Sequence, residues 1–154
     1  MGLPPFARIT VAIDGSKMGQ LALDLAIDLA RRYESDLSIV AVAPLQPVFV
    51  SSAEPWVPTE VPEAETNFYR GIVDKAVKEA ETAGVASATG VCLEGVVVDE
   101  IIAQVEKNPT DLLVLGSRGL STAKRLLLGS VSDAVSHHVQ CPVLIARAPR
   151  ATSG

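Results

Sequence analysis

Apolar residues follow two different periods along this chain, and each period predicts a different kind of element. Short runs rich in β-branched and aliphatic residues predict five buried strands, at residues 8–13, 37–43, 86–93, 111–115 and 142–147. Between these runs, apolar residues recur every three or four positions and predict helices over residues 18–29, 63–83, 98–105 and 130–138. Strands and helices therefore alternate along the sequence.

The apolar stripe of each long helix predicts the face that it buries. For the first helix the stripe is Met18, Leu21, Ala22, Leu25, Ala26 and Leu29, and for the second it is Phe68, Ile72, Ala76 and Ala80. Ser16 can cap the first helix, Gly84 is suited to end the second, and Pro109 limits the third. Residues 44–62 hold half of the chain's prolines and predict a surface loop, whose role we leave open.

The order of the elements predicts a single α/β domain over residues 1–148, followed by a tail at 149–154. Strand–helix–strand alternation implies right-handed crossovers and an open, Rossmann-like, five-stranded parallel sheet with helices on both faces. Such sheets bind ligands at the carboxyl ends of their strands, where the strand order switches. Two segments are therefore candidate ligand contacts: residues 14–16, and the segment that starts at Gly116.

Composition narrows the class of function. Hydrophobic residues make up 48% of the chain but aromatic residues only 4%, so the core must be aliphatic, as in helices packed on a parallel sheet. The net charge of −5 argues against partnership with nucleic acid or an anionic membrane, both of which require clustered lysine and arginine. Cys92 and Cys141 are isolated in sequence, and nothing after Met1 resembles a secretory signal, so we expect free thiols in a cytoplasmic protein.

The segment after the fourth predicted strand combines the features of a phosphate-binding site. Gly116-x-x-Gly119 follows the strand directly, and after nine further residues Gly129, Ser130 and Val131 open a helix. Glycines let a ligand approach backbone amides closely, and a helix start adds unpaired N–H groups and the positive end of the helix dipole. The Ser130 hydroxyl can donate to a phosphate oxygen.

Each of these residues also has a purely structural interpretation. Gly116 can end a strand in a plain turn, and Ser130 with Asp133 fits a capping box. The combination, with Lys124 and Arg125 in the loop of an acidic chain, favours ligand binding. The sequence has no G-x-x-x-x-G-K-[ST], G-x-G-x-x-G or G-x-S-x-G pattern, which argues against a P-loop NTPase, a dinucleotide dehydrogenase and an α/β-hydrolase.

The glycine motif and its context resemble the universal stress protein family, in its ATP-binding branch. Gly116-x-x-Gly119, nine residues and Gly129-Ser130 match the nucleotide motif of that family, and the resemblance covers nearly the whole chain. It implies an adenine-nucleotide α-hydrolase-like fold that binds ATP with a divalent ion such as Mg²⁺. The chain departs from many relatives at Gly95-Val96-Val97, where they have Gly-Asp-Pro, which argues against polar contacts from that loop.

The resemblance also implies a role for each matching residue. Asp14 would lie near the ribose or the adenine, and the backbone of Val42 would bond to adenine. The phosphates and ribose would be surrounded by Gly116, Arg118 and Gly119, and the phosphates held by the amides of Gly129, Ser130 and Val131. The last strand is apolar at successive positions, and both this edge and the resemblance imply a homodimer joined through Val143–Ala146.

These observations favour a regulatory ATP-binding protein of the stress response with little or no turnover, because no motif supplies a general base or an arginine finger. Two alternatives stay open at this point. One is a slow ATP-hydrolysing or adenylating enzyme on the same fold, although the turn Asp14-Gly15-Ser16 differs from the Ser-Gly-Gly of ATP pyrophosphatases. The other is a partner-binding module without nucleotide, against which the intact glycine motif argues. The protein partner and the pathway are unknown.

Overall fold

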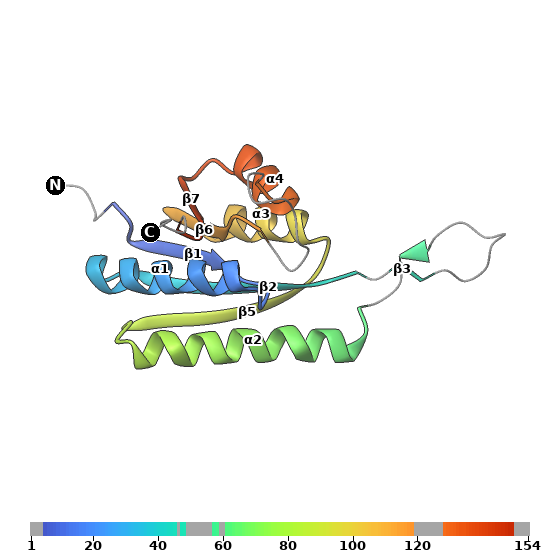
Figure 1. Cartoon of the computed structure of the whole chain (residues 1–154), viewed down its shortest axis with the longest axis horizontal. Coiled ribbons are helices and arrows are strands. Elements are labelled where there is room, and N and C mark those ends of the chain that lie inside the picture. Colours follow the sequence, from blue (N-terminus) through green and yellow to red (C-terminus); the bar gives the residue numbers. More distant parts are fainter. Residues whose placement is uncertain (1–4, 46, 49–56, 59–60, 119–127, 150–154) are drawn as a thin grey trace, which may run out of the picture.

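The protein is described by a computed structural model that defines residues 5–45, 47–48, 57–58, 61–118 and 128–149. Its body is a five-stranded sheet with the strand order β5-β2-β1-β6-β7 (Figure 1). The strands are β1 (Arg8–Ala12), β2 (Asp36–Pro44), β5 (Ser87–Gly95), β6 (Leu112–Gly116) and β7 (Val143–Ala146). The helices are α1 (Lys17–Tyr33), α2 (Glu63–Thr82), α3 (Val97–Lys107) and α4 (Ser130–His138).

All neighbouring strands of this sheet run parallel, which confirms the predicted open α/β architecture. In the central strand β1, Ile9 pairs with Leu37 of β2 on one side and with Leu112 of β6 on the other. The chain builds the sheet outward from β1 through β2 to β5, and then returns to add β6 and β7. The strand order therefore switches between β1 and β6, and sheets of this kind bind ligands at the carboxyl ends of such strands.

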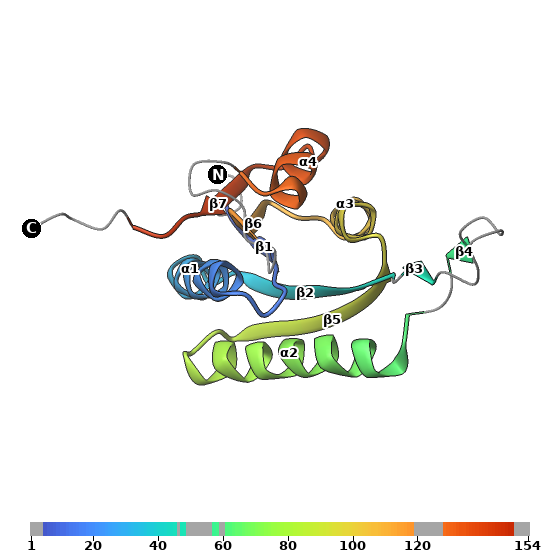
Figure 2. The ribbon, with the colours of Figure 1, turned by 45° about the vertical axis from the view of Figure 1, so that its right-hand side comes forward.

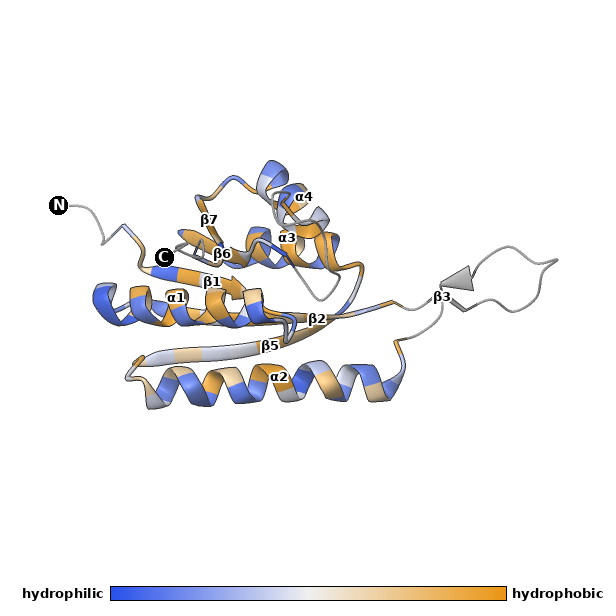
Figure 3. Cartoon of the chain, viewed as in Figure 1, coloured by the Kyte–Doolittle hydropathy of each residue, from blue (hydrophilic) through white to orange (hydrophobic). Residues whose placement is uncertain are grey.

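The helices cover both faces of the sheet (Figure 2). On one face, α1 and α2 bury their apolar sides against alternate residues of the strands, such as Ile9 and Val11. On the other face, α3 and α4 pack on Leu113 and Leu115. Because successive side chains of a strand point to opposite faces, and both faces are covered, β6 is buried at four successive positions. The helices instead carry stripes of apolar and polar residues (Figure 3).

The buried stripes of the two long helices differ in part from the predicted ones. The buried residues are Gly19, Ala22, Leu23, Ala26, Ile27 and Ala30 in α1, and Thr66, Tyr69, Val73, Ala76 and Ala80 in α2. The prediction was correct for the alanines and wrong for Leu25 and Phe68, which are 37% and 56% exposed. The helices lie close to the sheet: a Cβ atom on Gly90 of β5 would come within 2.4 Å of Val73 Cγ1. Large side chains such as Leu23, Ile27 and Val73 belong to these buried faces, and Leu25 and Phe68 lie outside them.

Most of the helix ends follow the signals in the sequence. The Ser16 hydroxyl caps α1 by accepting the N–H of Gly19 at 3.0 Å. Gly84, with φ of +100°, follows the end of α2, and α3 ends at Lys107, before Pro109. The predicted end of the third strand at residue 93 is wrong, because β5 continues through Gly95, whose pairing partner is Pro44 of β2.

The proline-rich segment contains a second, very small sheet. Residues Pro47–Val48 form β3 and pair antiparallel with β4, Val57–Pro58. The prediction of a plain loop over residues 44–62 was therefore wrong for these two pairs. Strand pairing of this length tolerates proline, because a two-stranded ribbon has edges at which no ladder hydrogen bond is required. Residues 46, 49–56 and 59–60 of the predicted loop lie outside the described residues.

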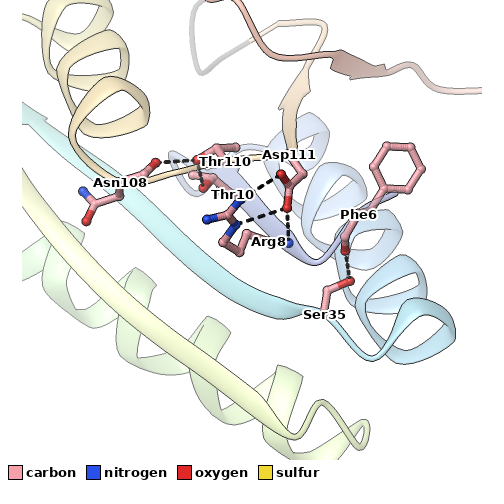
Figure 4. Close-up of polar contacts among 7 residues, drawn as sticks. All are labelled: Phe6, Arg8, Thr10, Ser35, Asn108, Thr110 and Asp111. Carbon is pink, nitrogen blue, oxygen red and sulfur yellow. Dashed lines mark hydrogen bonds and ion pairs between the residues drawn. The ribbon is translucent and has the colours of Figure 1, made fainter. Parts of the chain in front are cut away.

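Polar side chains tie the strands together at the amino-terminal edge of the sheet (Figure 4). The Arg8 guanidinium donates to the Asp111 carboxylate at 3.2 Å, and the Arg8 backbone N–H donates to the same carboxylate at 2.8 Å. The Thr10 and Thr110 hydroxyls lie 2.9 Å apart, and the Ser35 hydroxyl donates to the Phe6 carbonyl. These contacts join the starts of β1, β2 and β6, so they fix the sheet at the edge opposite to the carboxyl ends.

Candidate functional site

A cavity of about 530 Å³ opens at the carboxyl ends of the central strands. Its walls come from the ends of β1, β2 and β6, from three helices on both faces, and from the start of α4. The predicted site residues that line it are Asp14, Val42, Gly116, Arg118, Gly129, Ser130 and Val131. Gly119, Lys124 and Arg125 lie outside the described residues. The fold thus brings separate segments of the predicted site to a single cavity at the switch in strand order.

One end of the cavity is an apolar slot. Its walls are aliphatic side chains of two strands and one helix: Val40 and Val42 of β2, Leu115 of β6, and Val97 and Ile101 of α3. Val42, Leu115 and Ile101 belong to the core cluster beneath α3 and α4, so the slot continues into the packed interior. Walls of this kind favour an apolar or weakly polar part of a ligand, which displaces water from aliphatic side chains.

Asp14, which follows β1, adds a carboxylate-bearing side chain to the wall of the cavity. Its Oδ1 accepts the N–H of Ser16 at 3.0 Å, which holds the turn between β1 and α1. Gly15 has φ of +84°, a backbone conformation that residues with a side chain rarely adopt, so this turn requires a glycine. A Cβ atom on Gly19 would lie 3.0 Å from Asp14 Oδ1, and the glycine therefore leaves room for the carboxylate.

The start of α4 forms the polar end of the cavity. Gly129 is the N-cap, and the first N–H donated within the helix is that of Asp133, to the Gly129 carbonyl at 2.9 Å. The amides of Ser130, Val131 and Ser132 precede it and have no acceptor within the helix. The alternative in which Ser130 caps α4 was wrong, because Ser130 is already the first helical residue. Ser130 lines the cavity.

Hydrogen bonds connect Ser117, which follows β6, with the start of α4. The N–H of Gly129 donates to the Ser117 carbonyl at 2.6 Å, so this amide has a partner within the protein. The Ser132 hydroxyl lies 3.1 Å from the Ser117 carbonyl and 3.1 Å from the Gly129 carbonyl. Both serines are buried, and neither was singled out by the sequence. For Ser132, the one sequence signal was its spacing of three residues from Val135, which places both on the same face of α4.

Gly116 and Tyr69 complete the wall of the cavity. A Cβ atom on Gly116 would lie 2.8 Å from the carbonyl carbon of Met18, so the end of β6 lies directly against the start of α1. Tyr69 reaches the cavity from α2 and is 7% exposed. Burial raises the pKa of its hydroxyl, and the negative charges of Glu65 and Asp14 raise it further, so Tyr69 is a neutral hydrogen-bonding group beside the carboxylate. Tyr69 was not predicted as a site residue, because the apolar stripe of this helix was placed on Phe68.

The cysteines and histidines lie apart from this cavity. Cys92 and Cys141 are free thiols. Burial is the main reason that the pKa of each thiol is raised, and a raised pKa lowers the reactivity of a thiol. Nδ1 of His137 lies 2.7 Å from the carbonyl oxygen of Asp133, and Nδ1 of His138 lies 2.7 Å from that of Ala134, four residues earlier in α4 in each case. Within the described parts of the chain, no helix combines the length and apolarity that crossing a membrane requires.

The fold and the cavity define a class of protein: a doubly wound α/β domain with a ligand pocket at its topological switch point. Comparison with known proteins gives the family. The model of the universal stress protein family matches residues 5–147, and the chain belongs to this family. Universal stress protein YxiE of Bacillus subtilis is 37% identical over 150 residues, covering 92% of this chain and 99% of that protein.

Solved structures show the same fold. Universal stress protein UspA from Lactobacillus plantarum superposes with a TM-score of 0.80 at 24% identity, covering 92% of this chain and 98% of that one. A universal stress protein in complex with cAMP superposes with a TM-score of 0.69 at 26% identity, covering 92% of this chain and 97% of that one. The predicted family and fold class are confirmed.

Proposed function

We propose that this protein binds an adenine nucleotide, with ATP as its ligand, and acts as a regulatory protein of the stress response in the cytoplasm. One observation carries the proposal: an apolar slot, a carboxylate and an open helix amino terminus line the same cavity. These three features complement the base, the sugar and the phosphates of a nucleotide. The relative solved with cAMP supports an adenine nucleotide as the class of ligand.

In the proposed complex the adenine occupies the aliphatic slot. The backbone of Val42, at the end of β2, offers hydrogen bonds to the edge of the base, while the side chains of the slot contact its faces. Asp14 accepts hydrogen bonds from ribose hydroxyls. The base is then recognised mostly through backbone atoms and shape, so selectivity for adenine depends on the geometry of the slot.

The phosphates lie at the start of α4 in the proposed complex. The amides of Ser130 and Val131 donate to phosphate oxygens, together with the Ser130 hydroxyl and the positive end of the helix dipole. Arg118 adds a cation at the rim of the cavity, and Gly116 and Gly119 leave space for the phosphate chain.

A magnesium ion fits this site only as a partner of the phosphates. Asp14 is the only carboxylate among the described residues that line the cavity, and the described residues hold no group of three metal-binding side chains. Mg²⁺ is commonly held by one carboxylate, phosphate oxygens and water. We therefore propose that the ion arrives with ATP and neutralises part of the phosphate charge.

Low turnover follows from the same set of side chains. In-line attack on a phosphate needs a group that orients water and a cation that stabilises the developing charge. Among the described lining residues, Asp14 is the only side chain that can serve as a base, and one of its oxygens accepts the Ser16 N–H near the sugar end of the site. We propose that the protein responds to bound nucleotide rather than consuming it.

The direct test is to denature freshly purified protein, remove it, and identify any released nucleotide by chromatography and mass spectrometry. The nucleotide-free protein is then titrated by calorimetry with ATP, with and without Mg²⁺, and with GTP as the control. Co-purified adenine nucleotide or saturable ATP binding is the expected result. Repeated absence of both would overturn the proposal in favour of a partner-binding module, and rapid release of ADP would instead favour an enzyme.

We also propose that two copies pair through β7 to form a homodimer. β7 is at an edge of the sheet and pairs only with β6 among the described strands. Its first three residues, Val143, Leu144 and Ile145, are half-buried in the single chain, so a second copy would cover both apolar side chains and backbone groups. Light scattering after size exclusion should give the mass of two chains. A single-chain mass at all concentrations would contradict this assembly.

A further inference from the structure

The backbone of Ser117 connects three parts of the protein at the polar end of the cavity. Its N–H donates to the carbonyl of Ala146 at 2.8 Å, which fixes it to the end of β7. Its carbonyl oxygen faces the start of α4 and accepts the N–H of Gly129 at 2.6 Å. Ser117 is therefore held relative to the sheet through both its N–H and its carbonyl.

Ser132 adds a side chain to this arrangement. Its hydroxyl lies 3.1 Å from the carbonyl oxygen of Ser117 and 3.1 Å from that of Gly129. It has one proton to donate, which these two acceptors share. The residue is 3% exposed and lies at the wall of the cavity. Ser132 thus connects the residue that leaves β6 with the N-cap of α4.

These bonds determine the direction of the amides that follow the N-cap. Ser130 and Val131 lie between Gly129 and Ser132 in the first turn of α4, and both line the cavity. When the two ends of this turn are held against the sheet, the amides keep one orientation toward the cavity. Groups held in a fixed geometry bind an anion more tightly, because less ordering is needed on binding.

We propose that Ser132 is a positioning residue of the phosphate site, which acts by holding the Ser130 and Val131 amides in their binding orientation. This inference rests on the proposed nucleotide function and adds a residue to it. Ser132 does so through the carbonyls of Ser117 and Gly129, which its hydroxyl contacts. Loss of one such hydrogen bond should weaken ATP binding about fivefold.

The test compares Ser132→Ala with Ser35→Ala in the full chain. Ser35 is a matched control: it is also 3% exposed, and its hydroxyl also donates to a backbone carbonyl, that of Phe6 (Figure 4). It lies at the amino-terminal edge of the sheet, opposite to the cavity. Calorimetry with ATP measures affinity, and urea unfolding measures the general loss of stability in each variant.

The expected result is that both variants lose stability and only Ser132→Ala loses ATP affinity, by about fivefold. Equal ATP affinity in Ser132→Ala and the wild type would overturn the inference, as would an equal loss of affinity in both variants. If Ser132→Ala does not fold, Ser132→Thr carries the test, because a helical threonine hydroxyl can still reach the carbonyl three residues earlier. Wild-type affinity in folded Ser132→Thr supports the role, and a fivefold loss overturns it. Failure of the wild type to bind ATP would instead refute the proposed function.

Discussion

The end of β6 packs directly on the start of α1, and Gly116 makes this approach sterically possible. A Cβ atom at residue 116 would lie 2.8 Å from the carbonyl carbon of Met18 and 2.9 Å from its oxygen. Cβ contacts essentially never fall below 3.0 Å, and these two atoms of Met18 are backbone, which cannot rotate away. Gly116→Ala must therefore push α1 and β6 apart.

The cost of this displacement is that of overpacking a well-packed interface. One added methyl group of this kind destabilises a protein by about 1–3 kcal/mol. We expect about 2 kcal/mol for Gly116→Ala, which corresponds to about 6 °C in the unfolding temperature of a chain of this length. Gly116 is not one of the glycines with positive φ, so alanine adds no backbone strain and the loss is steric.

Gly71→Ala is the matched control for this experiment. Gly71 is exposed in α2, and a Cβ atom there would meet nothing within 4 Å. Alanine is favoured over glycine in a helix by about 1 kcal/mol, so this variant should be more stable than the wild type. Urea unfolding followed by circular dichroism measures both changes. Wild-type stability in Gly116→Ala, or equal losses in the two variants, would refute the steric argument.

Three further predictions concern helix capping, pH and the ligand. Val96 is the N-cap of α3, and its side chain cannot accept a hydrogen bond from the first amides of the helix. Val96→Asp should therefore raise the free energy of unfolding by about 1 kcal/mol, and an unchanged urea midpoint would contradict this. The hydrogen bond and charge of Arg8 lower the pKa of Asp111, and a carboxyl with a lowered folded pKa contributes stability that is lost as the pH falls through that pKa. The free energy of unfolding should therefore decline as the pH falls below 3.8, the ordinary pKa of an aspartate. Arg8→Gln should reduce this decline in urea titrations at successive pH values. Parallel pH profiles of the variant and the wild type would argue against the ion pair. Gly129→Val should abolish ATP binding in a folded protein, because its Cβ would lie 3.0 Å from the Ser117 carbonyl oxygen and its branches would crowd the cavity; wild-type affinity in calorimetry would count against the proposed phosphate site.

The fold was predictable because its determinants are mostly local. A parallel strand covered on both faces is a continuous apolar run, and 111–115 shows this so plainly that β6 was located to within one residue. Helix starts and ends carry their own signals, such as Ser16 and Gly84. The predicted element bounds were wrong where pairing with a segment distant in sequence sets the end of a strand. β5 extends to Gly95 because β2 pairs with it there through Pro44. The short pairing of β3 with β4 has no hydrophobic period from which it could be inferred.

The candidate site was predictable at its glycines and not at the residues that hold them. Gly116 and Gly129 stand at the junctions between strand and helix, where a motif can be recognised. Ser132 is an ordinary helical serine by sequence, and its contact with Ser117 exists only after β6 and α4 are packed together. Tyr69 comes from α2, where the buried face lies one residue away from the predicted one. Tyr69 is therefore buried, and Phe68, its neighbour in sequence, is exposed.

The two edges of the sheet use polar groups in opposite ways. At the amino-terminal edge, Arg8 bonds to Asp111 and Thr10 to Thr110 across neighbouring strands. These side chains satisfy one another, so no ligand is needed to pair them. At the carboxyl-terminal edge the polar groups are largely backbone amides at the start of α4, together with the Asp14 carboxylate. A ligand that binds the native state adds stability in proportion to the logarithm of its concentration. If the proposed function holds, nucleotide should therefore stabilise the start of α4 against local unfolding more than it stabilises the start of β1. The start of β1 is already held by hydrogen bonds between side chains.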